Sequence, residues 1–434
     1  MDPPYNTEAT HNDGNSVAND KENIESKKFI YRDKFSRNGW LNLMNERLKL
    51  AKKLLKDDGM IFVSIDDSQQ AYLKILMDEI FGEENFVANI VWQKKNLGSG
   101  QDSKHLKVIT EYILLYANNI NKLDLSEISK DVEKSLDYKY EDEYVSTRGK
   151  YKTNQLDRAS LTWSKGMDYK FEYQGKTYYP GGSEQNWKMR HQGKHAEKDW
   201  RWRWSYDKLI KGIEDGFVIF ENNKIFTKQY QFVDNSNQKI ERKEKFTNLI
   251  IDADKQGPQG TNVLKDIFSG FKVFDHPKPT NLLTHLLSMR PNQNARVLDF
   301  FAGSGTTGHA VLELNRQDGG NRSFTLVTNN QNNIGTKITY ERLFRINKGE
   351  GTKGETFDWA NKNESYKSNL NVYNINYFDV SLTQDQTTLN ELIDKLKKLF
   401  KDFDINLENT KQNNYKLLLD SLLALKPQKA DEQN

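Results

Sequence analysis

A short, rigid segment that carries a carboxylate opens the chain at Asp2-Pro3-Pro4-Tyr5. Two consecutive prolines fix φ, so the Asp2 carboxylate and a neighbouring backbone carbonyl would be held still as hydrogen-bond acceptors. Such a pair suits the amino group of a nucleobase such as adenine N6, because binding both amino hydrogens draws the nitrogen lone pair out of the ring. Tyr5 adds an aromatic face for a base that has left its stack. The same four residues also suit an ordinary turn near a terminus.

A glycine-rich turn later in the chain has the spacing of a nucleotide-binding turn. The apolar stretch 295–301 runs into Ala302-Gly303-Ser304-Gly305-Thr306-Thr307-Gly308, and a helical pattern follows over 309–315. Glycines permit the bend and let a ligand approach the backbone, while the helix start offers free N–H groups. A dinucleotide site would need an acidic residue about 20 positions on, and none occurs between Asp318 and Glu341. A turn without any ligand is the alternative.

Tryptophans and basic residues alternate in the middle of the chain. Four of the eight tryptophans lie between 187 and 204, and three of them, Trp200, Trp202 and Trp204, alternate with arginines. An extended segment of this kind would bury the indoles on one face and present guanidinium groups on the other, where they suit phosphates and guanine edges. A solvated arginine face is the alternative. The residues that we expect to contact DNA are Arg201, Arg203, Lys198 and Arg190.

Helical and strand patterns alternate around these segments. Helical spacing runs from 36 to 55 and from 73 to 81, an apolar strand is expected at 60–65, and further strands at 86–92 and 112–116. This alternation favours a mostly parallel sheet. A helix is expected at 282–287 and a strand, turn, helix and strand over 295–327. Beyond 349 we expect a strand over 370–380 and helices over 388–402 and 414–425.

Composition narrows the possible chemistry. The chain has no cysteine, which excludes thiolate nucleophiles, including the one that methylation at cytosine C5 requires, and fits a reducing, cytoplasmic location. The net charge of +3 leaves any nucleic-acid contact to local basic clusters. No apolar run approaches the roughly 18 residues of a membrane span. The histidines lack the spacing and acidic partners of a metal site, so we expect no metal.

The order of these motifs carries a resemblance to a known family. Asp2-Pro3-Pro4-Tyr5-Asn6-Thr7, then His276-Pro277-Lys278-Pro279, then Phe301 to Thr307 resemble the motifs of amino-methyltransferases in the circular order called the beta class. The segments 35–41, 58–67, 79–86 and 111–116 further resemble the modification subunits of type III restriction-modification systems. The resemblance covers roughly residues 1–350.

This resemblance implies a fold, an activity and a set of roles. The fold would be α/β, with a Rossmann-like core that uses S-adenosylmethionine, an inserted target-recognition domain and a C-terminal α/β extension. The activity would be site-specific methylation of adenine N6 in duplex DNA, with a restriction subunit as partner and a homodimer as the assembly. Asp2, Pro3, Pro4 and Tyr5 would be catalytic. The implied cofactor residues are Asp299, Phe301, Ala302, Gly303, Ser304, Gly305, Thr306, Lys278 and Pro279.

We expect four regions: the catalytic half of the core at 1–120, the DNA-recognition region at 121–262, the cofactor half at 263–349 and an interaction module at 350–434. The chain departs from the family pattern in one respect. The catalytic motif normally ends a buried strand, whereas only Met1 precedes Asp2. A truncated, non-catalytic DNA-binding or partner subunit therefore stays an alternative, as do methylation of cytosine N4 and of RNA or a protein amide.

Overall fold

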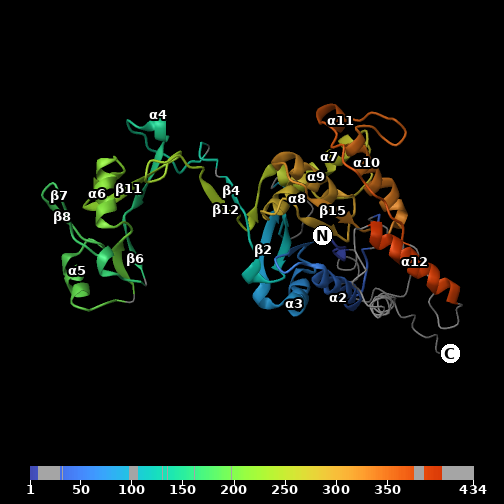
Figure 1. The fold of residues 1–434 in the computed structure, drawn as a ribbon, viewed down its shortest axis with the longest axis horizontal. Coiled ribbons are helices and arrows are strands. Elements are labelled where there is room, and N and C mark those ends of the chain that lie inside the picture. The colour runs from blue at the N-terminus through green and yellow to red at the C-terminus, as the bar shows by residue number, and fades with distance from the viewer. Residues whose placement is uncertain are drawn as a thin grey trace. The chain divides into compact units, whose positions relative to one another are not determined.

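The computed structural model describes residues 1–7, 30–31, 33–96, 106–129, 131–133, 135–160, 162–196, 198–375 and 386–402. Contacts divide the chain into two compact units, Met1–Ser368 and Asn369–Asn434 (Figure 1). Helix and sheet are mixed in the first unit, which is an α/β fold as expected. Among the described residues, every helix is too short or too polar to span a bilayer.

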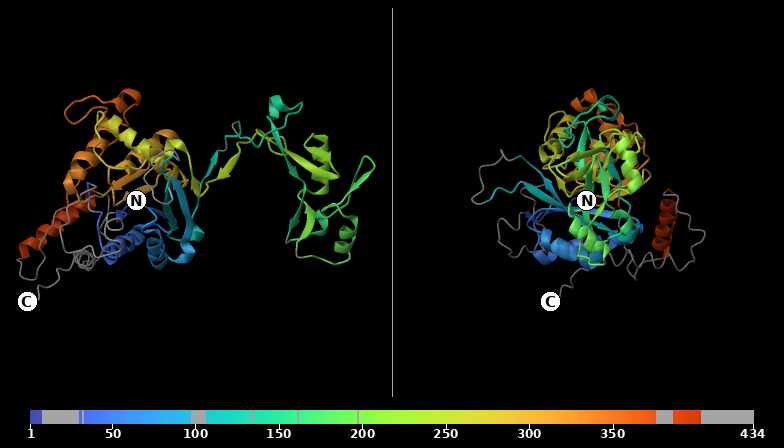
Figure 2. Two further views of the ribbon diagram at one scale, coloured as in Figure 1. Left: turned by 180° about the vertical axis from the view of Figure 1, so that it is seen from behind. Right: turned by 90° about the vertical axis from the view of Figure 1, so that its left-hand side faces the viewer.

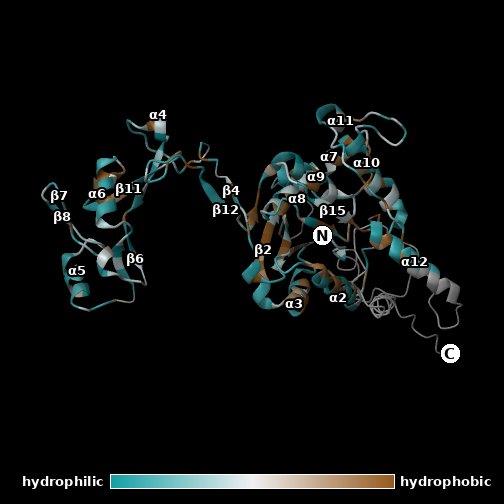
Figure 3. Ribbon diagram, in the orientation of Figure 1, coloured by the Kyte–Doolittle hydropathy of each residue, from teal (hydrophilic) through white to brown (hydrophobic). Residues whose placement is uncertain are grey.

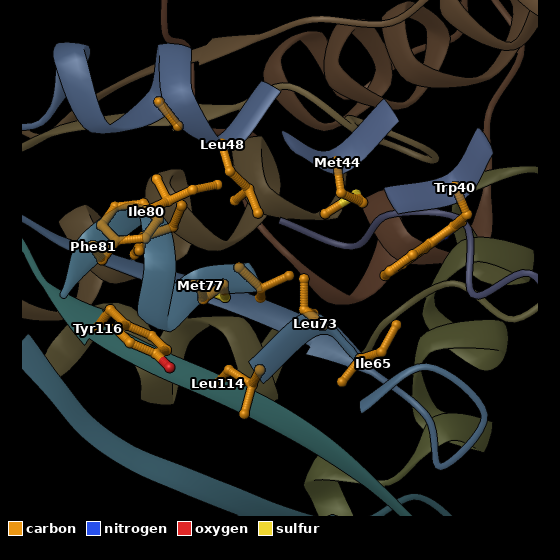
Figure 4. Close-up of a cluster of buried hydrophobic side chains, with 13 residues drawn as sticks. Trp40, Met44, Leu48, Ile65, Leu73, Met77, Ile80, Phe81, Leu114 and Tyr116 are labelled. Atoms are coloured by element: carbon orange, nitrogen blue, oxygen red, sulfur yellow. The ribbon is translucent and has the colours of Figure 1, made fainter. Parts of the chain in front are cut away.

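Two helices and a buried strand form the first core. Helix α2 (Arg37–Leu54) starts at Ser36, whose hydroxyl accepts a hydrogen bond from the amide of Gly39 at 2.9 Å. Strand β1 (Met60–Ile65) and helix α3 (Gln70–Phe81) follow. Figure 4 shows side chains of α2 and α3 meeting above the sheet. The fully buried members include Trp40, Met44, Leu48, Val63, Ile65, Leu73, Met77, Leu114 and Tyr116.

The central sheet has the order β1-β3-β2-β13, where β2 is Phe86–Gln93, β3 is Thr110–Ala117 and β13 is Leu249–Ile250. Strand β3 is antiparallel to both of its neighbours, and β13 is parallel to β2. The expectation of a mostly parallel sheet was therefore wrong for the pairing around β3. Strand β1 reaches β2 through helix α3, so these two strands run the same way, whereas no helix is assigned between β2 and β3 among the described residues.

The residue before Asp2 is joined to this sheet. The amino group of Met1 donates to the carbonyl of Phe62 at 2.9 Å, and the amide of Ser64 donates to the carbonyl of Met1 at 3.1 Å. Both partners belong to β1, so Met1 pairs with β1 as a strand residue would. Figure 2 shows the same from two further directions: in both views the N-terminus lies within the outline of the first unit. The backbone that leads into Asp2 is consequently fixed on the central sheet.

The expected strand, turn, helix and strand is confirmed. Strand β14 (Arg296–Asp299) and strand β15 (Ser323–Leu326) pair in parallel on either side of α9 (Thr306–Asp318) in the chain. Helices in the same part of the unit are α7 (Gly257–Ile267), α8 (Thr280–Ser288), α10 (Tyr340–Lys348) and α11 (Asp358–Lys362), and a π-helical turn, η6 (Ile334–Thr339), leads into α10.

The middle of the chain builds a core of its own around Phe171, Trp202, Phe217 and Tyr230. Its main sheet has the order β10-β11-β5. Strands β7 and β8 form a hairpin, and β6 pairs with β9, from which β7, β8 and α5 separate it in the chain. In Figure 3, β2 of the central sheet is hydrophobic, whereas β4 and β12 are hydrophilic. The bounds are β4 (Glu127–Ser129), α4 (Val145–Arg148), β5 (Tyr151–Gln155), β6 (Asp157–Ser160), β7 (Phe171–Tyr173), β8 (Lys176–Tyr178), α5 (Glu184–His191), β9 (Asp199–Trp202), α6 (Tyr206–Glu214), β10 (Val218–Glu221), β11 (Lys224–Tyr230) and β12 (Lys243–Lys245).

The second unit contains helix α12 (Gln386–Asp402), which confirms the helix expected over 388–402. Residues 370–375 have no regular structure, so the expected strand is not formed there. An alternating pattern alone does not supply the neighbouring strand that a ladder needs. The rest of that strand, 376–380, and the helix expected over 414–425 lie outside the described residues.

The core of α2 provides a stability prediction. Leu48→Ala removes a fully buried side chain and should lower the free energy of unfolding by about 2–5 kcal/mol, measured by urea denaturation. Leu54→Ala on the same helix is the matched control, because that side chain is 62% exposed. Equal losses from the two substitutions would contradict the packing described.

Candidate active site

The segment Asp2 to Tyr5 is held by hydrogen bonds at both ends. The indole Nε1 of Trp40 donates to the carbonyl of Pro4 at 2.8 Å. The amide of Asn6 donates to the Asp33 carboxylate at 2.9 Å, and Asn6 itself has a φ of 58°. Pro3 is buried, and Met1 on its other side pairs with β1. The turn that the sequence indicated is therefore a fixed one.

The segment Asp2 to Tyr5 meets two charged side chains from distant parts of the sequence, and a third joins them through Glu111. Lys278 Nζ lies 3.0 Å from Asp2 Oδ1 and 3.3 Å from Glu111 Oε2. The hydroxyl of Tyr5 donates to Glu111 Oε2 at 3.1 Å. Lys94 Nζ donates to Glu111 Oε1 at 3.1 Å. Two carboxylates and two ammonium groups thus form one network, which we call the charge quartet: Asp2, Glu111, Lys94 and Lys278.

Burial shapes the ionisation of this site. Burial disfavours the charged form of Lys278, but the carboxylates of Asp2 and Glu111 outweigh it and raise the pKa of Lys278. Burial likewise opposes ionisation of Glu111, yet the ammonium groups of Lys278 and Lys94 hold the pKa of Glu111 below its ordinary value. Burial, followed by the charges of Asp2 and Glu111, raises the pKa of Tyr5 well above its ordinary value. At neutral pH Lys278 and Glu111 are charged and Tyr5 keeps its proton.

The antiparallel pairing of β1 and β3 places a further carboxylate, that of Asp66, beside the start of β3, where Glu111 lies. Asp66 directly follows β1, and the β1 residue before it pairs with the residue after Glu111. The hydroxyl and amide of Ser68 both donate to Asp66, and that hydroxyl also donates to the Tyr5 carbonyl at 3.2 Å. Burial raises the pKa of Asp66. The backbone of Tyr5 is thereby tied to the end of β1.

The glycine turn adopts a backbone that requires glycine. Gly303 and Gly305 have φ values of 51° and 77°, in the left-handed region. The buried carboxylate of Asp299 accepts from the amide of Phe301 at 3.1 Å and from the hydroxyl of Thr307 at 2.5 Å. Asp299 therefore fixes the shape of the turn. No side chain caps the start of α9, so its backbone N–H groups point into the turn.

A buried arginine holds the back of the turn. The guanidinium of Arg342 donates to the Thr306 hydroxyl at 2.8 Å, the Ser304 hydroxyl at 3.2 Å and the Thr280 hydroxyl at 3.2 Å. Burial lowers the pKa of Arg342 to about 9. Because the hydroxyls of Ser304 and Thr306 face Arg342, these residues offer a ligand their backbone and not their side chains.

The two motifs lie next to each other. Phe301 of the glycine turn packs against the same core cluster as Met1 and Tyr5. Lys278 and the buried Pro279 directly precede α8, whose first residue, Thr280, bonds Arg342 behind the turn. The 278–280 segment therefore bridges the charge quartet and the glycine turn.

The residues of the turn fit S-adenosylmethionine. Glycines at 303 and 305 leave room for close approach to the backbone, and the uncapped start of α9 provides donors for the carboxylate of the ligand. The amide-rich stretch after β15, 328–331, is the candidate for contacts to the ribose. The assignment of individual side chains to the cofactor stays a prediction.

Comparisons with known proteins show to which family the chain belongs. A family model described as DNA methylase matches residues 1–348. The chain belongs to this DNA methylase family. It is 35% identical over 417 residues to the Mod subunit of the type III restriction-modification enzyme StyLTI of Salmonella typhimurium, which is 90% of this chain and 58% of that protein. It is 33% identical to the type II methyltransferase M.KpnI of Klebsiella pneumoniae, over 80% of this chain and 78% of that one.

A third relative is the probable HindVI Mod subunit of Haemophilus influenzae, 29% identical over 93% of this chain and 54% of that protein. The chain thus spans less than two thirds of the length of these two type III Mod subunits. The family match nevertheless includes both motifs and the segment that bridges them.

The middle region of this chain places its basic residues unequally. Lys198 and Arg203 are exposed, and Arg201 is half-buried. Trp202 and Trp204 are buried as expected, while Trp200 is 37% exposed. Of these six side chains, Trp200 departs from the expected separation of indoles and cations, because its indole is exposed.

Arg190 has a different environment from the other candidates. Its guanidinium is buried and forms two hydrogen bonds to the Asp168 carboxylate, at 2.8 and 2.9 Å, and a third to the carbonyl of Pro180. The sequence gave no sign of this pairing, because Asp168 lies 22 positions away. We therefore assign Arg190 to the interior of the middle region and no longer to DNA contact.

Three functional candidates were absent from the sequence-based set. Glu111 is an acid at the start of the apolar strand β3, and a charge in that position is a signal of a buried partner. Lys94 directly follows β2, and Arg342 lies in the amphipathic helix α10. Among the described residues, no three His, Asp or Glu side chains are placed to bind a metal ion. The expectation of metal-free chemistry stays a prediction.

The close packing of α7 on the segment before α8 can be tested at Gly260. A methyl group on Gly260 of α7 would overlap the carbonyl oxygen of Pro277, next to Lys278. Gly260→Ala should therefore lower the free energy of unfolding by about 1–3 kcal/mol, measured by urea denaturation. Gly166→Ala is the control, because a methyl group there meets nothing within 4 Å. An unchanged stability for Gly260→Ala would refute the close packing of α7 on this segment.

Proposed function

We propose that this chain is a site-specific DNA methyltransferase that transfers a methyl group from S-adenosylmethionine to adenine N6 in duplex DNA. The observation that carries the proposal is the fixed Asp2-Pro3-Pro4-Tyr5 segment beside a glycine turn, in a chain of the DNA methylase family. We further propose that it is the modification subunit of a type III system, with a restriction subunit as partner and a homodimer as its assembly. The similarity to type III Mod subunits supports this.

Two acceptors in the segment suit the amino group of adenine. Trp40 already occupies the carbonyl of Pro4, whereas no hydrogen bond from the described residues reaches the carbonyl of Pro3. Asp2 and the Pro3 carbonyl would each accept one amino hydrogen, which localises the lone pair on N6. As the methyl group passes from the sulfonium to N6, the new C–N bond would replace an N–H bond, and the Asp2 carboxylate, which already accepts that hydrogen, would take the proton.

Tyr5 is the proposed stacking surface for the flipped base. Its hydroxyl is fixed by Glu111 at 3.1 Å and its backbone carbonyl by Ser68, so the ring has one orientation. An ordered aromatic ring suits a base that has left the duplex. The ammonium of Lys278 lies over this ring, 4.9 Å from its centroid.

The proposed methyl donor is S-adenosylmethionine, whose sulfonium supplies an activated methyl group when bound. The backbone of 302–306 would hold it, with Asp299 and Phe301 supporting the turn and Lys278 and Pro279 closing it on the catalytic side. The geometry that favours this is the pair of positive-φ glycines and the uncapped start of α9.

A basic ribbon in the middle region is the proposed DNA contact. Arg158 of β6 lies directly opposite Arg201 of β9, and like charges in that position destabilise a strand pair. A phosphate between them would remove the repulsion. Arg203 and Lys198 are exposed near the two ends of β9. These four residues form the proposed ribbon, and Arg158 is an addition to the sequence-based set.

The enzyme proposal is tested by Asp2→Ala. Transfer of radiolabelled methyl groups to unmethylated genomic DNA should fall by at least about a hundredfold, because the carboxylate that holds the amino group is gone. Asp358→Ala, an exposed aspartate on α11, is the matched control and should retain the rate. The labelled nucleoside should be N6-methyladenine. N4-methylcytosine would reject adenine as the target, and DNA binding without any transfer would favour a non-catalytic subunit.

The ribbon is tested by Arg203→Ala. Affinity for a duplex, measured by fluorescence anisotropy over a salt series, should fall, and the slope of log Kd against log salt should decrease by about one. Arg296→Ala, which removes an exposed arginine from β14, should leave the slope unchanged. A slope that Arg203→Ala leaves intact would remove that residue from the interface.

A further inference from the structure

Glu111 is a buried carboxylate to which the proposed chemistry gives no direct task. It is 8% exposed, and both of its oxygens are engaged. One oxygen faces Lys94, and the other faces the Tyr5 hydroxyl and Lys278. Removing a charge and its three cationic or donor partners from water costs free energy. We therefore asked what Glu111 does for the site.

Lys278 stands between two competing carboxylates. Its ammonium is 3.0 Å from Asp2 and 3.3 Å from Glu111. If Glu111 were uncharged, the ammonium would have Asp2 as its one anionic partner in the quartet. The attraction between two such charges is strong away from bulk water. Asp2 would then be engaged by Lys278 instead of being open to an incoming amino group.

We propose that Glu111 is a positioning residue that shares Lys278 with Asp2 and thereby keeps the Asp2 carboxylate available to the target amine. The proposal rests on the proposed function, since it concerns the same site. When the amino group reaches Asp2, Lys278 moves toward Glu111, so its charge stays paired throughout. Glu111 also holds the Tyr5 hydroxyl, which couples the position of Lys278 to the orientation of the stacking ring.

Lys94 orients Glu111 and balances the charge of the quartet. It bonds the Glu111 oxygen that faces away from Lys278, which fixes the plane of the carboxylate. It also balances the quartet, because two ammonium groups then accompany two carboxylates. The quartet as a whole therefore stays neutral whether Lys278 lies nearer to Asp2 or nearer to Glu111.

The test is a double-mutant cycle between Glu111→Gln and Lys278→Met. The glutamine retains the shape and an acceptor for Tyr5 but removes the charge. In the otherwise native protein, the single-turnover rate of methyl transfer should fall about ten- to a hundredfold, because the amine is misplaced. In the Lys278→Met background the same change should alter the rate by less than about threefold, since no ammonium is left to capture Asp2. Glu79→Gln on the exposed face of α3 is the matched control.

Two further readouts separate positioning from folding. Affinity for S-adenosylmethionine, measured by isothermal titration calorimetry, should be the same in Glu111→Gln and the native protein. Glu111→Asp keeps the charge on a shorter side chain and should recover part of the lost rate. Equal losses from Glu111→Gln in both backgrounds, no loss in either, or a loss that follows cofactor affinity would each overturn the proposal.

A crystal structure of the Glu111→Gln variant tests the same proposal without activity. Lys278 should pair with Asp2 alone, and a Lys278 that stays between positions 2 and 111 would overturn the idea. If the native chain transfers no methyl group, the proposed function fails, and this structure still decides whether Glu111 positions Lys278. Should Glu111→Gln not fold, the structure and rate of Glu111→Asp decide in its place: Lys278 displaced toward Asp2 with a reduced rate supports the proposal, and an unmoved Lys278 with the native rate rejects it.

Discussion

The pairing of two carboxylates with two ammonium groups, centred on the largely buried Glu111 and Lys278, is the interaction on which the rest of the site depends. Asp2, Glu111, Lys94 and Lys278 come from four separate segments, yet contacts of 3.0 to 3.3 Å join them. Removing one member would leave an uncompensated charge in the interior, which is strongly destabilising. The first residues of the chain, the edge of the central sheet and the start of α8 must therefore meet at one place.

The fold meets this requirement through strand direction. Because β3 runs against both neighbours, its first residues lie beside the end of β1, so Glu111 and Asp66 share an edge. Because Met1 pairs with β1, the next residue, Asp2, also lies near this edge of the sheet. On the other side, Arg342 ties the glycine turn to Thr280, two residues beyond Lys278. The segment Asp2 to Tyr5 and the glycine turn are thus held by one continuous set of contacts.

The elements that depend on residues close together in the sequence were predictable. Helix α2, the buried strand β1 and the unit around the glycine turn follow from the spacing of apolar residues and from the positions of glycines, which are local features of the sequence. The direction of β3, the partners of Glu111 and the burial of Arg190 were not predictable, because each depends on residues far away in the sequence. Asp168 and Arg342 carried no local mark of their roles, since a charged residue in an amphipathic segment is ordinarily solvent-facing.

The most direct test of the account is a crystal structure of the protein with S-adenosylhomocysteine, the product that remains after methyl transfer. The account predicts this thioether along the backbone of Gly303 to Gly305, with Lys278 still between Asp2 and Glu111 on the adjoining side. A ligand bound elsewhere, or an Asp2 detached from Lys278 and from the edge of β1, would contradict the claim that one contiguous site joins the two motifs.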